Sequence, residues 1–353
     1  MRLGVLDVGS NTVHLLVVDA HPGGHPNPMR SEKTQLRLAE HINAGRLTGA
    51  GADGLVRAVA RAKAAATIAG CEELLAFATS ALRDADNSVA VLSRVRSETG
   101  VGLQVLSGED EARYTFLAVR RWYGWSAGRL LVLDIGGGSL ELAAGRDEDP
   151  VLALSLPLGA GRLTRQRLTD DPPTRRDVEA LAEDLEAALT PIARQIRQAG
   201  PYELAVGTSK TFRSLARLAA AAPAGTGQRA RRTLTDGGLR QLFSFISRMA
   251  SPDLATLDGV SPGRAHQLVA GALVAQVAMR ALEVSELQIC PWALREGVIL
   301  RRLDTLGVPA PSQRPWPLTD RHPGASSISH AATVRPPSSP ASHTVTWLLR
   351  PEK

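Results

Sequence analysis

The chain has 353 residues and a formal net charge of +6 at pH 7, which is enough length for two domains that each bury a core of their own. Hydrophobic residues make up 44% and charged residues 22%, as is ordinary for a soluble globular protein, whereas aromatic residues reach only 4%. So few aromatic rings argue against a base-stacking nucleic-acid surface, and no apolar run approaches the ~20 residues of a membrane helix. The positive charge suits a small anionic substrate at least as well as DNA.

Cysteine use and the N-terminal pattern predict a cytoplasmic protein. Cys71 and Cys290 each lie in or beside an apolar run, which is typical of buried free thiols rather than of a disulfide or a metal site. The first apolar run is interrupted by Asp7 and lacks the cleavage pattern of a signal peptide. We expect neither DNA nor a membrane among the partners.

The first predicted element is a β-hairpin over residues 3–18, which read LGVLDVGSNTVHLLVV. Two apolar runs flank Asp7 and a turn made of Gly9, Ser10 and Asn11, so the pattern predicts strand, turn and strand. A single copy of this pattern is most often a tight turn with a solvated aspartate.

Strands and helices alternate along the rest of the chain, which predicts an α/β architecture. A loop over residues 220–227 and a disordered tail rich in Pro, Ser, His and Thr from about residue 307 are expected from composition. The expected strands cover residues 74–78, 103–106, 130–142 as a second hairpin, 151–156, 203–206 and 287–290. The expected helices cover residues 55–68, 89–98, 109–123, 161–168, 176–197, 238–249, 264–282 and 294–303.

The second hairpin, LLVLDIGGGSLEL, repeats the first in register. Two copies at a domain-sized separation indicate two homologous halves that face each other across a cleft. The three consecutive glycines let backbone N–H groups approach a phosphate closely. Carboxylates on both sides of the turn could hold a hard cation. Aligning Asp7 with Asp134 places Gly9 on Gly136, Thr12 on Ser139 and His14 on Glu141.

The segments VLDVGSN and VLDIGGGSLEL resemble the two phosphate loops of the superfamily that holds actin, the heat-shock chaperone ATPases and the sugar kinases. Within it, the chain resembles the exopolyphosphatase/guanosine pentaphosphate phosphatase (Ppx/GppA) family over residues 1–304. Three further segments carry this resemblance: FATSALRDADN at 77–87, LSGEDEARYTFLAV at 106–119 and LREGVIL at 294–300.

The resemblance implies two ribonuclease H-like (actin-like ATPase) domains flanking a cleft. The expected limits are 1–122, joined by a return helix at 294–304, and 123–293, followed by a disordered tail at 305–353. The C-terminal HD-like helical domain of larger family members is not expected here. A homodimer is implied by the resemblance only.

The same resemblance implies roles for individual residues. Glu111 is the expected base that activates water, and Arg83 the expected phosphate-binding arginine. The acidic neighbours Glu109 and Asp110 should raise the pKa of Glu111, although acidic residues also simply favour a helix N-terminus. The expected ligands of Mg²⁺ or Mn²⁺ are Asp134 and Glu141, with Asp7 from the facing loop, and K⁺ is an additional candidate.

Phosphate oxygens should be bound by the two turns. A weaker candidate is the segment where superfamily kinases contact adenosine, because the family's common Gly-Gly-Thr reads Val206-Gly207-Thr208 here. The phosphate-binding candidates are Gly9, Ser10, Asn11, Gly136, Gly137, Gly138 and Ser139, followed by Thr208, Ser209 and Lys210.

The resemblance implies an exopolyphosphatase that releases orthophosphate from inorganic polyphosphate, with a preference for short chains. The runner-up is hydrolysis of the 5′ γ-phosphate of guanosine pentaphosphate, and guanosine penta- or tetraphosphate could also inhibit. A sugar- or acetate-type kinase would not be expected to carry SGEDEAR. An alarmone-binding regulator would have no need of the carboxylates at 111, 134 and 141.

Overall fold

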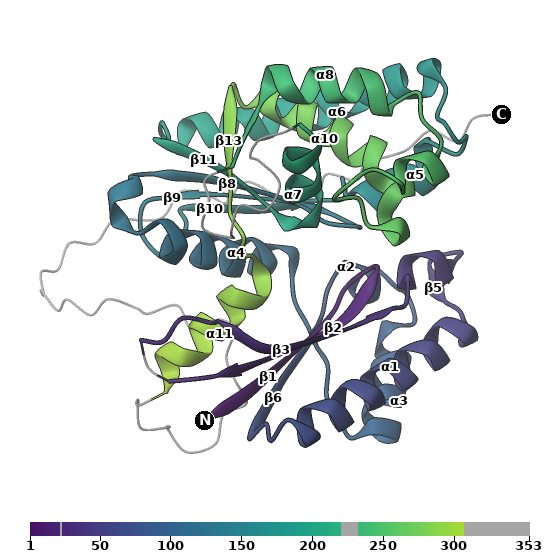
Figure 1. Cartoon of the computed structure of the whole chain (residues 1–353), viewed down its shortest axis with the longest axis vertical. Helices are drawn as coiled ribbons and strands as arrows, with labels where there is room; N and C mark the ends of the chain where they lie inside the picture. The colour runs from purple at the N-terminus through teal and green to yellow at the C-terminus, as the bar shows by residue number, and fades with distance from the viewer. Residues whose placement is uncertain (22, 220–231, 307–353) are drawn as a thin grey trace, which may run out of the picture. The chain divides into compact units, whose positions relative to one another are not determined.

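The computed structural model describes residues 1–21, 23–219 and 232–306. The predicted loop at 220–227 and the predicted tail from residue 307 lie outside these residues. Within them the chain forms two central mixed sheets flanked by helices (Figure 1). None of the described helices is long and apolar enough to cross a membrane.

The first sheet is built from the N-terminal hairpin. Its strand order is β3-β2-β1-β6-β7, in which β1, β2 and β3 are antiparallel and β6 and β7 run parallel to β1. Helix α1 packs against α3 and β2, and their apolar side chains form one buried core. The bounds are β1 (Arg2–Val8), β2 (Thr12–Asp19), β3 (Pro28–Gln35), β6 (Glu73–Ala78), β7 (Gln104–Val105), α1 (Gly49–Ile68), α2 (Ser80–Arg83) and α3 (Ser88–Thr99), with a small hairpin of β4 (Ile42–Asn43) and β5 (Arg46–Leu47) after a 3-10 turn (Leu38–His41).

The second sheet repeats this topology and adds one strand. Its order is β10-β9-β8-β11-β13-β12, in which β8, β9 and β10 are antiparallel and β11 and β13 run parallel to β8. The added edge strand β12 is antiparallel to β13. Helix α10 is almost wholly buried and packs against α5, α6 and α8. The strands are β8 (Leu130–Ile135), β9 (Leu140–Gly145), β10 (Leu152–Leu156), β11 (Leu204–Thr208), β12 (Thr233–Thr235) and β13 (Glu286–Ile289). The helices are α5 (Ala160–Arg167), α6 (Arg175–Gln198), α7 (Ser209–Leu218), α8 (Asp236–Ile246), α9 (Ser251–Leu254) and α10 (Leu268–Ala281), with 3-10 turns at Trp125–Ala127 and Pro262–Gln267.

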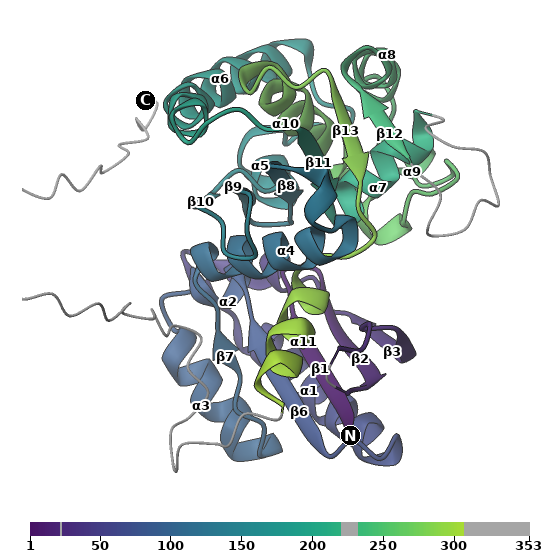
Figure 2. The same cartoon turned by 90° about the vertical axis from the view of Figure 1, so that its left-hand side faces the viewer.

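Two helices join the halves. Helix α4 (Gly108–Tyr123) packs against β8, β9 and β10 as well as against α11 (Leu294–Thr305), and α11 also contacts β1 (Figure 2). Gly297 makes the α4–α11 crossing close, because a Cβ there would lie 1.8 Å from the carbonyl oxygen of Tyr114. The chain therefore returns to the first half at residue 294, and the described elements end with α11. The expected domain limits stay a prediction.

The structure differs from the expected elements mainly where local propensity is weak. Helix α1 begins at Gly49 rather than at residue 55, because Thr48 caps it by accepting a hydrogen bond from the Gly51 amide. The expected helix over 264–282 starts as a 3-10 turn and becomes α-helical only at Leu268. Strand β3 was not predicted, since its sequence PMRSEKTQ is polar and lies at an exposed sheet edge.

Candidate active site

The two hairpins place equivalent residues in equivalent positions. The Gly9 amide donates to the Thr12 carbonyl at 3.0 Å, and the Gly136 amide donates to the Ser139 carbonyl at 2.9 Å. In register, Asp7 lies opposite His14 in the first hairpin, and Asp134 lies opposite Glu141 in the second. Residues directly opposite on antiparallel strands share one face of the sheet. The alignment made from the sequence is therefore confirmed in the structure.

The two turns touch each other. Ser10 from the first turn hydrogen-bonds through its Oγ to the Oγ of Ser80 at 2.9 Å. A Cβ on Gly138 would lie 2.4 Å from that Ser80 oxygen, and a Cβ on Gly137 would lie 2.8 Å from the side-chain Nδ2 of Asn11. Glycine is required at these two positions because the facing half approaches so closely.

Asn11 is held by a residue of the second half. Gln267 donates through Nε2 to Asn11 Oδ1 at 2.9 Å, and Asn11 Nδ2 donates back to Gln267 Oε1 at 3.3 Å. Both side chains are buried. The Asn11 amide is therefore fixed by Gln267 in this structure, and its side chain lies between the two halves.

Glu111 lies in the first turn of α4, which Ser107 caps by accepting a hydrogen bond from the Asp110 amide at 3.0 Å. Its side chain is buried and forms an ion pair with the Nη1 of Arg83. Burial raises the pKa of Glu111 well above its usual range, the negative charge of Glu141 raises it further, and Arg83 opposes both. A carboxylate with a raised pKa suits a general base that works near neutral pH.

The expected source of that pKa shift was wrong. Glu109 turns outward to an ion pair with Arg113, and Asp110 accepts a hydrogen bond from the Ser107 hydroxyl at 2.7 Å. Neither is a cause of the raised pKa of Glu111. The charge that acts on it comes from Glu141, which is thirty residues away in sequence and belongs to the other hairpin.

Asp134 and Glu141 form an acidic pair in which Glu141 is buried and Asp134 is half-buried. Burial raises the pKa of Asp134 to about 6, with the charge of Arg213 opposing. Burial and the charge of Asp134 raise the pKa of Glu141 to about 7. The Ser155 hydroxyl donates to Glu141 Oε1 at 2.9 Å. Two carboxylates that repel each other in a buried site are the donor chemistry that a divalent cation relieves.

The residues present fit a hydrated Mg²⁺ ion. Among residues 1–21, 23–219 and 232–306, no three or more His, Cys, Asp or Glu side chains are arranged as a ready metal cage. Mg²⁺ commonly binds one or two carboxylates and completes its shell with water and substrate phosphate. Asp134 and Glu141 supply that number of carboxylates. The third expected ligand, Asp7, lies 3.6 Å from the guanidinium of Arg295, and burial raises its pKa while Arg295 lowers it.

A pocket borders Arg83 and the second glycine turn. It is lined by Arg83, Asp84, Gly138, Ser139 and Ser155, together with the start of α4. Arg83 and the glycine turn therefore face the same space, as expected for groups that bind one phosphate.

Comparison with known proteins identifies the chain. The model of the Ppx/GppA phosphatase family matches residues 17–306. The chain belongs to this family.

Relatives of this Ppx/GppA chain are named exopolyphosphatases. It is 64% identical over 306 residues to Exopolyphosphatase 1 of Mycobacterium tuberculosis, which covers 86% of this chain and 89% of that protein. It is 62% identical over 306 residues to Exopolyphosphatase 1 of Mycobacterium leprae, over 86% and 90% of the two chains. The solved structure of the Aquifex aeolicus Ppx/GppA phosphatase is 28% identical with a TM-score of 0.68, and the match covers 85% of this chain and 99% of that one. A Cytophaga hutchinsonii exopolyphosphatase, 23% identical over 86% and 98% of the two chains, shares the fold with a TM-score of 0.79.

The fold expected from the resemblance, two actin-like domains, is thus confirmed. The described residues contain no helical domain beyond α11.

The weaker phosphate candidates of the Ppx/GppA chain lie on the Asp134 side of the site, because Thr208 pairs with Asp134 across the sheet. Thr208 is buried, and its hydroxyl donates to the Trp292 carbonyl at 2.7 Å. Ser209 begins α7 with a φ of 74°, in the left-handed region. Lys210 lines a second pocket with Arg264 and Gln267. These residues therefore do not border the pocket that holds Arg83.

Two further basic residues, Lys33 and Arg264, lie near the predicted Lys210 and were not predicted. Burial, followed by neighbouring positive charges, lowers the pKa of Lys210, of Lys33 and of Arg264. They come from β3, α7 and a 3-10 turn, so no local pattern links them. Several positive charges gathered in one place favour the binding of an anionic ligand. Asp84 and Arg162 were also missed, although Arg162 follows the glycines at 159 and 161 at the start of α5.

Proposed function

We propose that this chain is an exopolyphosphatase, which hydrolyses the terminal phosphoanhydride of inorganic polyphosphate and releases orthophosphate. The observation that carries the proposal is the buried Glu111 with its raised pKa, ion-paired to Arg83 at a pocket that Gly138 and Ser139 also line. The shared name of the mycobacterial relatives supports the same reaction.

Glu111 acts as the general base. It accepts a proton from water while the water oxygen forms a bond to the terminal phosphorus. The bridging P–O bond breaks, and its electron pair stays on the oxygen of the shortened polyphosphate. Correctly placed general bases contribute about 10²- to 10⁴-fold to the rate.

Arg83 binds the terminal phosphate. Its guanidinium offers parallel N–H donors that match phosphate oxygens. In the structure the Nη1 of Arg83 is ion-paired to Glu111. A phosphate that takes over the guanidinium would therefore leave Glu111 free to accept a proton. The amides of the 136–138 turn and the Ser139 hydroxyl supply further donors to the same phosphate, with Gly9, Ser10 and Asn11 in the facing turn.

Asp134 and Glu141 would hold Mg²⁺ or Mn²⁺, with Asp7 as a third carboxylate. When bound, the cation neutralises charge on the phosphoryl oxygens and on the leaving group. Their raised pKa values fall toward the ordinary range when a cation replaces the proton. K⁺ is retained as an additional candidate.

The proposal is tested by measuring phosphate release from short polyphosphate with Mg²⁺ and with EDTA, for the wild type and for Glu111→Gln. We expect Mg²⁺-dependent release that falls by about 10³-fold in the variant, because the base is lost while shape is kept. Unchanged release in Glu111→Gln would overturn its role as the base. Release that EDTA does not affect would overturn the cation.

A second candidate function is hydrolysis of guanosine pentaphosphate. Its phosphates would suit the positively charged pocket with Lys210 and Arg264, as would the further phosphates of polyphosphate. Release from guanosine pentaphosphate but not from polyphosphate would establish this alternative. Tight binding of the alarmone without release from either would instead indicate a regulator.

Four finer features complete the proposal: a preference for short polyphosphate, a homodimer, a cytoplasmic location and a link to the stringent response through guanosine penta- or tetraphosphate. Faster processing of long chains than of short ones would contradict the first. Light scattering coupled to gel filtration would test the second.

A further inference from the structure

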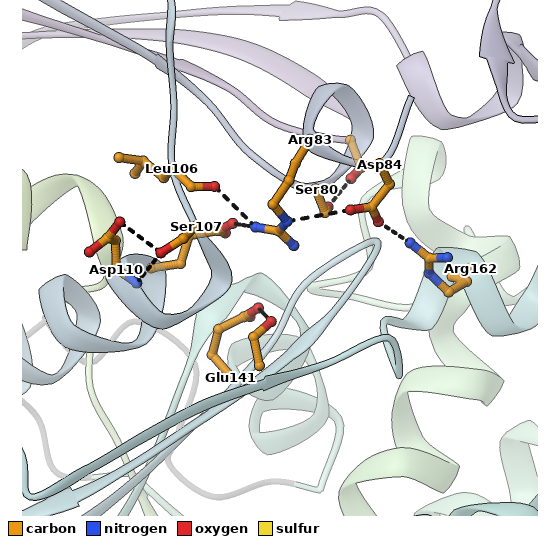
Figure 3. Close-up of polar contacts among 11 residues, drawn as sticks. Ser80, Arg83, Asp84, Leu106, Ser107, Asp110, Glu141 and Arg162 are labelled. Carbon is orange, nitrogen blue, oxygen red and sulfur yellow. Dashed lines mark hydrogen bonds and ion pairs between the residues drawn. The ribbon is translucent and has the colours of Figure 1, made fainter. Parts of the chain in front are cut away.

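A series of ion pairs, to which no role has been given above, leads away from Arg83. Asp84 presents its Oδ1 to the Nε of Arg83 at 3.4 Å, and its Oδ2 forms an ion pair with the Nη2 of Arg162 (Figure 3). Arg83 in turn forms its ion pair with Glu111 through Nη1. The order of contacts is therefore Arg162, Asp84, Arg83 and Glu111, and it crosses from the second half of the molecule to the first.

Arg162 is also anchored to the glycine turn. Its Nε donates to the Gly138 carbonyl at 2.9 Å, and its backbone amide donates to the Gly137 carbonyl at 2.8 Å. One residue at the start of α5 therefore holds the turn that would bind phosphate and the carboxylate that contacts Arg83. Asp84 is fixed from its own side as well, since its amide donates to the Ser80 carbonyl at 3.0 Å.

We propose that Asp84 and Arg162 are positioning residues that orient the Arg83 guanidinium relative to the 136–138 turn. This inference rests on the proposed hydrolysis of polyphosphate. Asp84 engages the Nε edge of Arg83, which directs the opposite Nη1 edge toward Glu111 and the space where a terminal phosphate binds. Arg162 couples that orientation to the turn, so the two sets of phosphate donors keep one geometry.

The exposure of the side chains argues for orientation rather than for stability. Arg83, Asp84 and Arg162 keep 23%, 36% and 24% of their side-chain surface accessible. Partly exposed ion pairs contribute little to folding free energy. Misplacing a phosphate donor, in contrast, can cost about 10²-fold in rate when the error is of the order of 1 Å.

The decisive experiment compares Asp84→Asn, Asp84→Glu and Arg162→Gln with the wild type, using short polyphosphate and Mg²⁺. We expect kcat to fall by about 10-fold or more in Asp84→Asn and Arg162→Gln, with a smaller change in KM, because the donor is misplaced most in the transition state. Asp84→Glu should recover part of kcat, since it restores the negative charge. Melting temperatures should stay close to that of the wild type.

Arg167→Gln is the matched control. Arg167 lies on the same helix as Arg162 and forms an ion pair with Asp184, at 34% side-chain exposure. Its ion pair involves none of Arg162, Asp84, Arg83 and Glu111. Its substitution should leave kcat and KM unchanged, whereas an equal loss of kcat in Arg167→Gln and Arg162→Gln would overturn the proposal.

A double variant with Arg83 tests whether Asp84 acts through Arg83 or contacts the substrate directly. In an Arg83→Gln background, adding Asp84→Asn should lower kcat no further, because the residue through which Asp84 acts is gone. A full additional loss in the double variant would overturn the proposal. So would a kcat that is unchanged once corrected for the folded fraction.

A binding measurement keeps this inference distinct from the proposed function. Imidodiphosphate, a phosphate anion with a non-hydrolysable bridge, is titrated into each protein with Mg²⁺ by calorimetry. If the wild type binds it but hydrolyses no polyphosphate, the proposed function fails, and weaker binding by Asp84→Asn than by Arg167→Gln still supports the positioning role. For a wild type that binds but does not hydrolyse, equal binding by both variants overturns the positioning role, and so does a wild type that neither binds nor hydrolyses.

Discussion

The two hairpins share a backbone and differ in charge. In the first, the position opposite Asp7 is His14, whose Nδ1 accepts a hydrogen bond from Arg295 and whose Nε2 lies 2.7 Å from the Ser31 hydroxyl. In the second, the position opposite Asp134 is Glu141. The first hairpin therefore pairs its acid with a neutral ring and a protein cation, whereas the second sets two acids against each other.

The two copies of the hairpin therefore differ in the charge that they place opposite the aspartate. Burial, together with Arg295, lowers the pKa of His14 to about 3, so the ring stays neutral at any physiological pH. Burial, together with Asp134, raises the pKa of Glu141 to about 7. The same strand position thus avoids positive charge in one half and accumulates negative charge in the other. We infer that the second hairpin supplies the carboxylate pair of the cation site, whereas the first hairpin contributes Asp7 alone.

The largest difference in kcat between the two hairpins should appear when Glu141 and His14 are each replaced by glutamine. Glu141→Gln is expected to lower kcat by about 10²-fold or more, because it removes half of the carboxylate pair that would hold the cation. His14→Gln keeps a neutral hydrogen-bonding side chain and should change kcat by less than about 10-fold, within the range of an ordinary lost contact. Steady-state phosphate release at saturating Mg²⁺ measures both. Similar losses in the two variants would mean that the halves contribute equally.

The next effect is on the pH dependence of Mg²⁺ stabilisation. Asp134 and Glu141 titrate above their ordinary values of 3.8 and 4.5, at about 6 and about 7. The folded state therefore holds protons that the unfolded state has released, so the metal-free protein loses stability as the pH rises from about 4.5 to about 7. Mg²⁺ binds the deprotonated pair and restores that loss.

Thermal unfolding with and without Mg²⁺ should consequently show a larger increase in melting temperature at about pH 8 than at about pH 5.5. At a Mg²⁺ concentration about 100 times Kd the stabilisation is about 2.7 kcal/mol. Glu141→Gln should abolish most of the difference. An increase that is the same at both pH values would show that these carboxylates do not hold the ion.

The sequence alone predicted the repeated hairpin, but it did not predict the contacts that the two hairpins make with the rest of the protein. The alignment of Asp7 with Asp134, and of His14 with Glu141, needed only spacing, because a hairpin has a period of two and its turn fixes the register. Glu111 and Arg83 came from the family resemblance, and the structure brings them into an ion pair. Contacts between the halves carry no local signal, which is why Arg162 was overlooked.

The pKa of Glu111 shows the same limit. Its acidic neighbours in sequence suggested themselves as the cause, yet helix geometry points Glu109 and Glu111 in different directions. The effective neighbour is Glu141, which only the folded arrangement brings near.

A smaller effect is expected from the glycines of the second turn. A Cβ on Gly138 would lie 2.4 Å from Ser80 Oγ, whereas a Cβ on Gly136 would meet nothing nearer than 3.4 Å. Gly138→Ala should therefore destabilise the protein by about 1–3 kcal/mol through overpacking, while Gly136→Ala should be nearly neutral. Denaturant unfolding measures both. Adding Ser80→Gly to Gly138→Ala should recover stability. Equal costs for Gly138→Ala and Gly136→Ala would argue against close contact between the second turn and α2.

The smallest effect is an acid-side signature of the first hairpin. His14 has a pKa of about 3 when folded and about 6.5 when unfolded, so the unfolded state binds the extra proton between these values. Folding stability contributed by the neutral ring is therefore lost as the pH falls from about 6.5 toward 3, which is opposite in sign to the effect of Glu141. His14→Gln cannot take up that proton, and its stability should decline less steeply between about pH 6.5 and pH 5, by about 1.6 kcal/mol over this window. Urea unfolding across the window tests this slope independently of any constant loss from the removed hydrogen bonds. Parallel curves for the wild type and His14→Gln would mean that the folded ring takes up its proton over the same pH range as the unfolded one, and the contrast between the two hairpins would then rest on Glu141 alone.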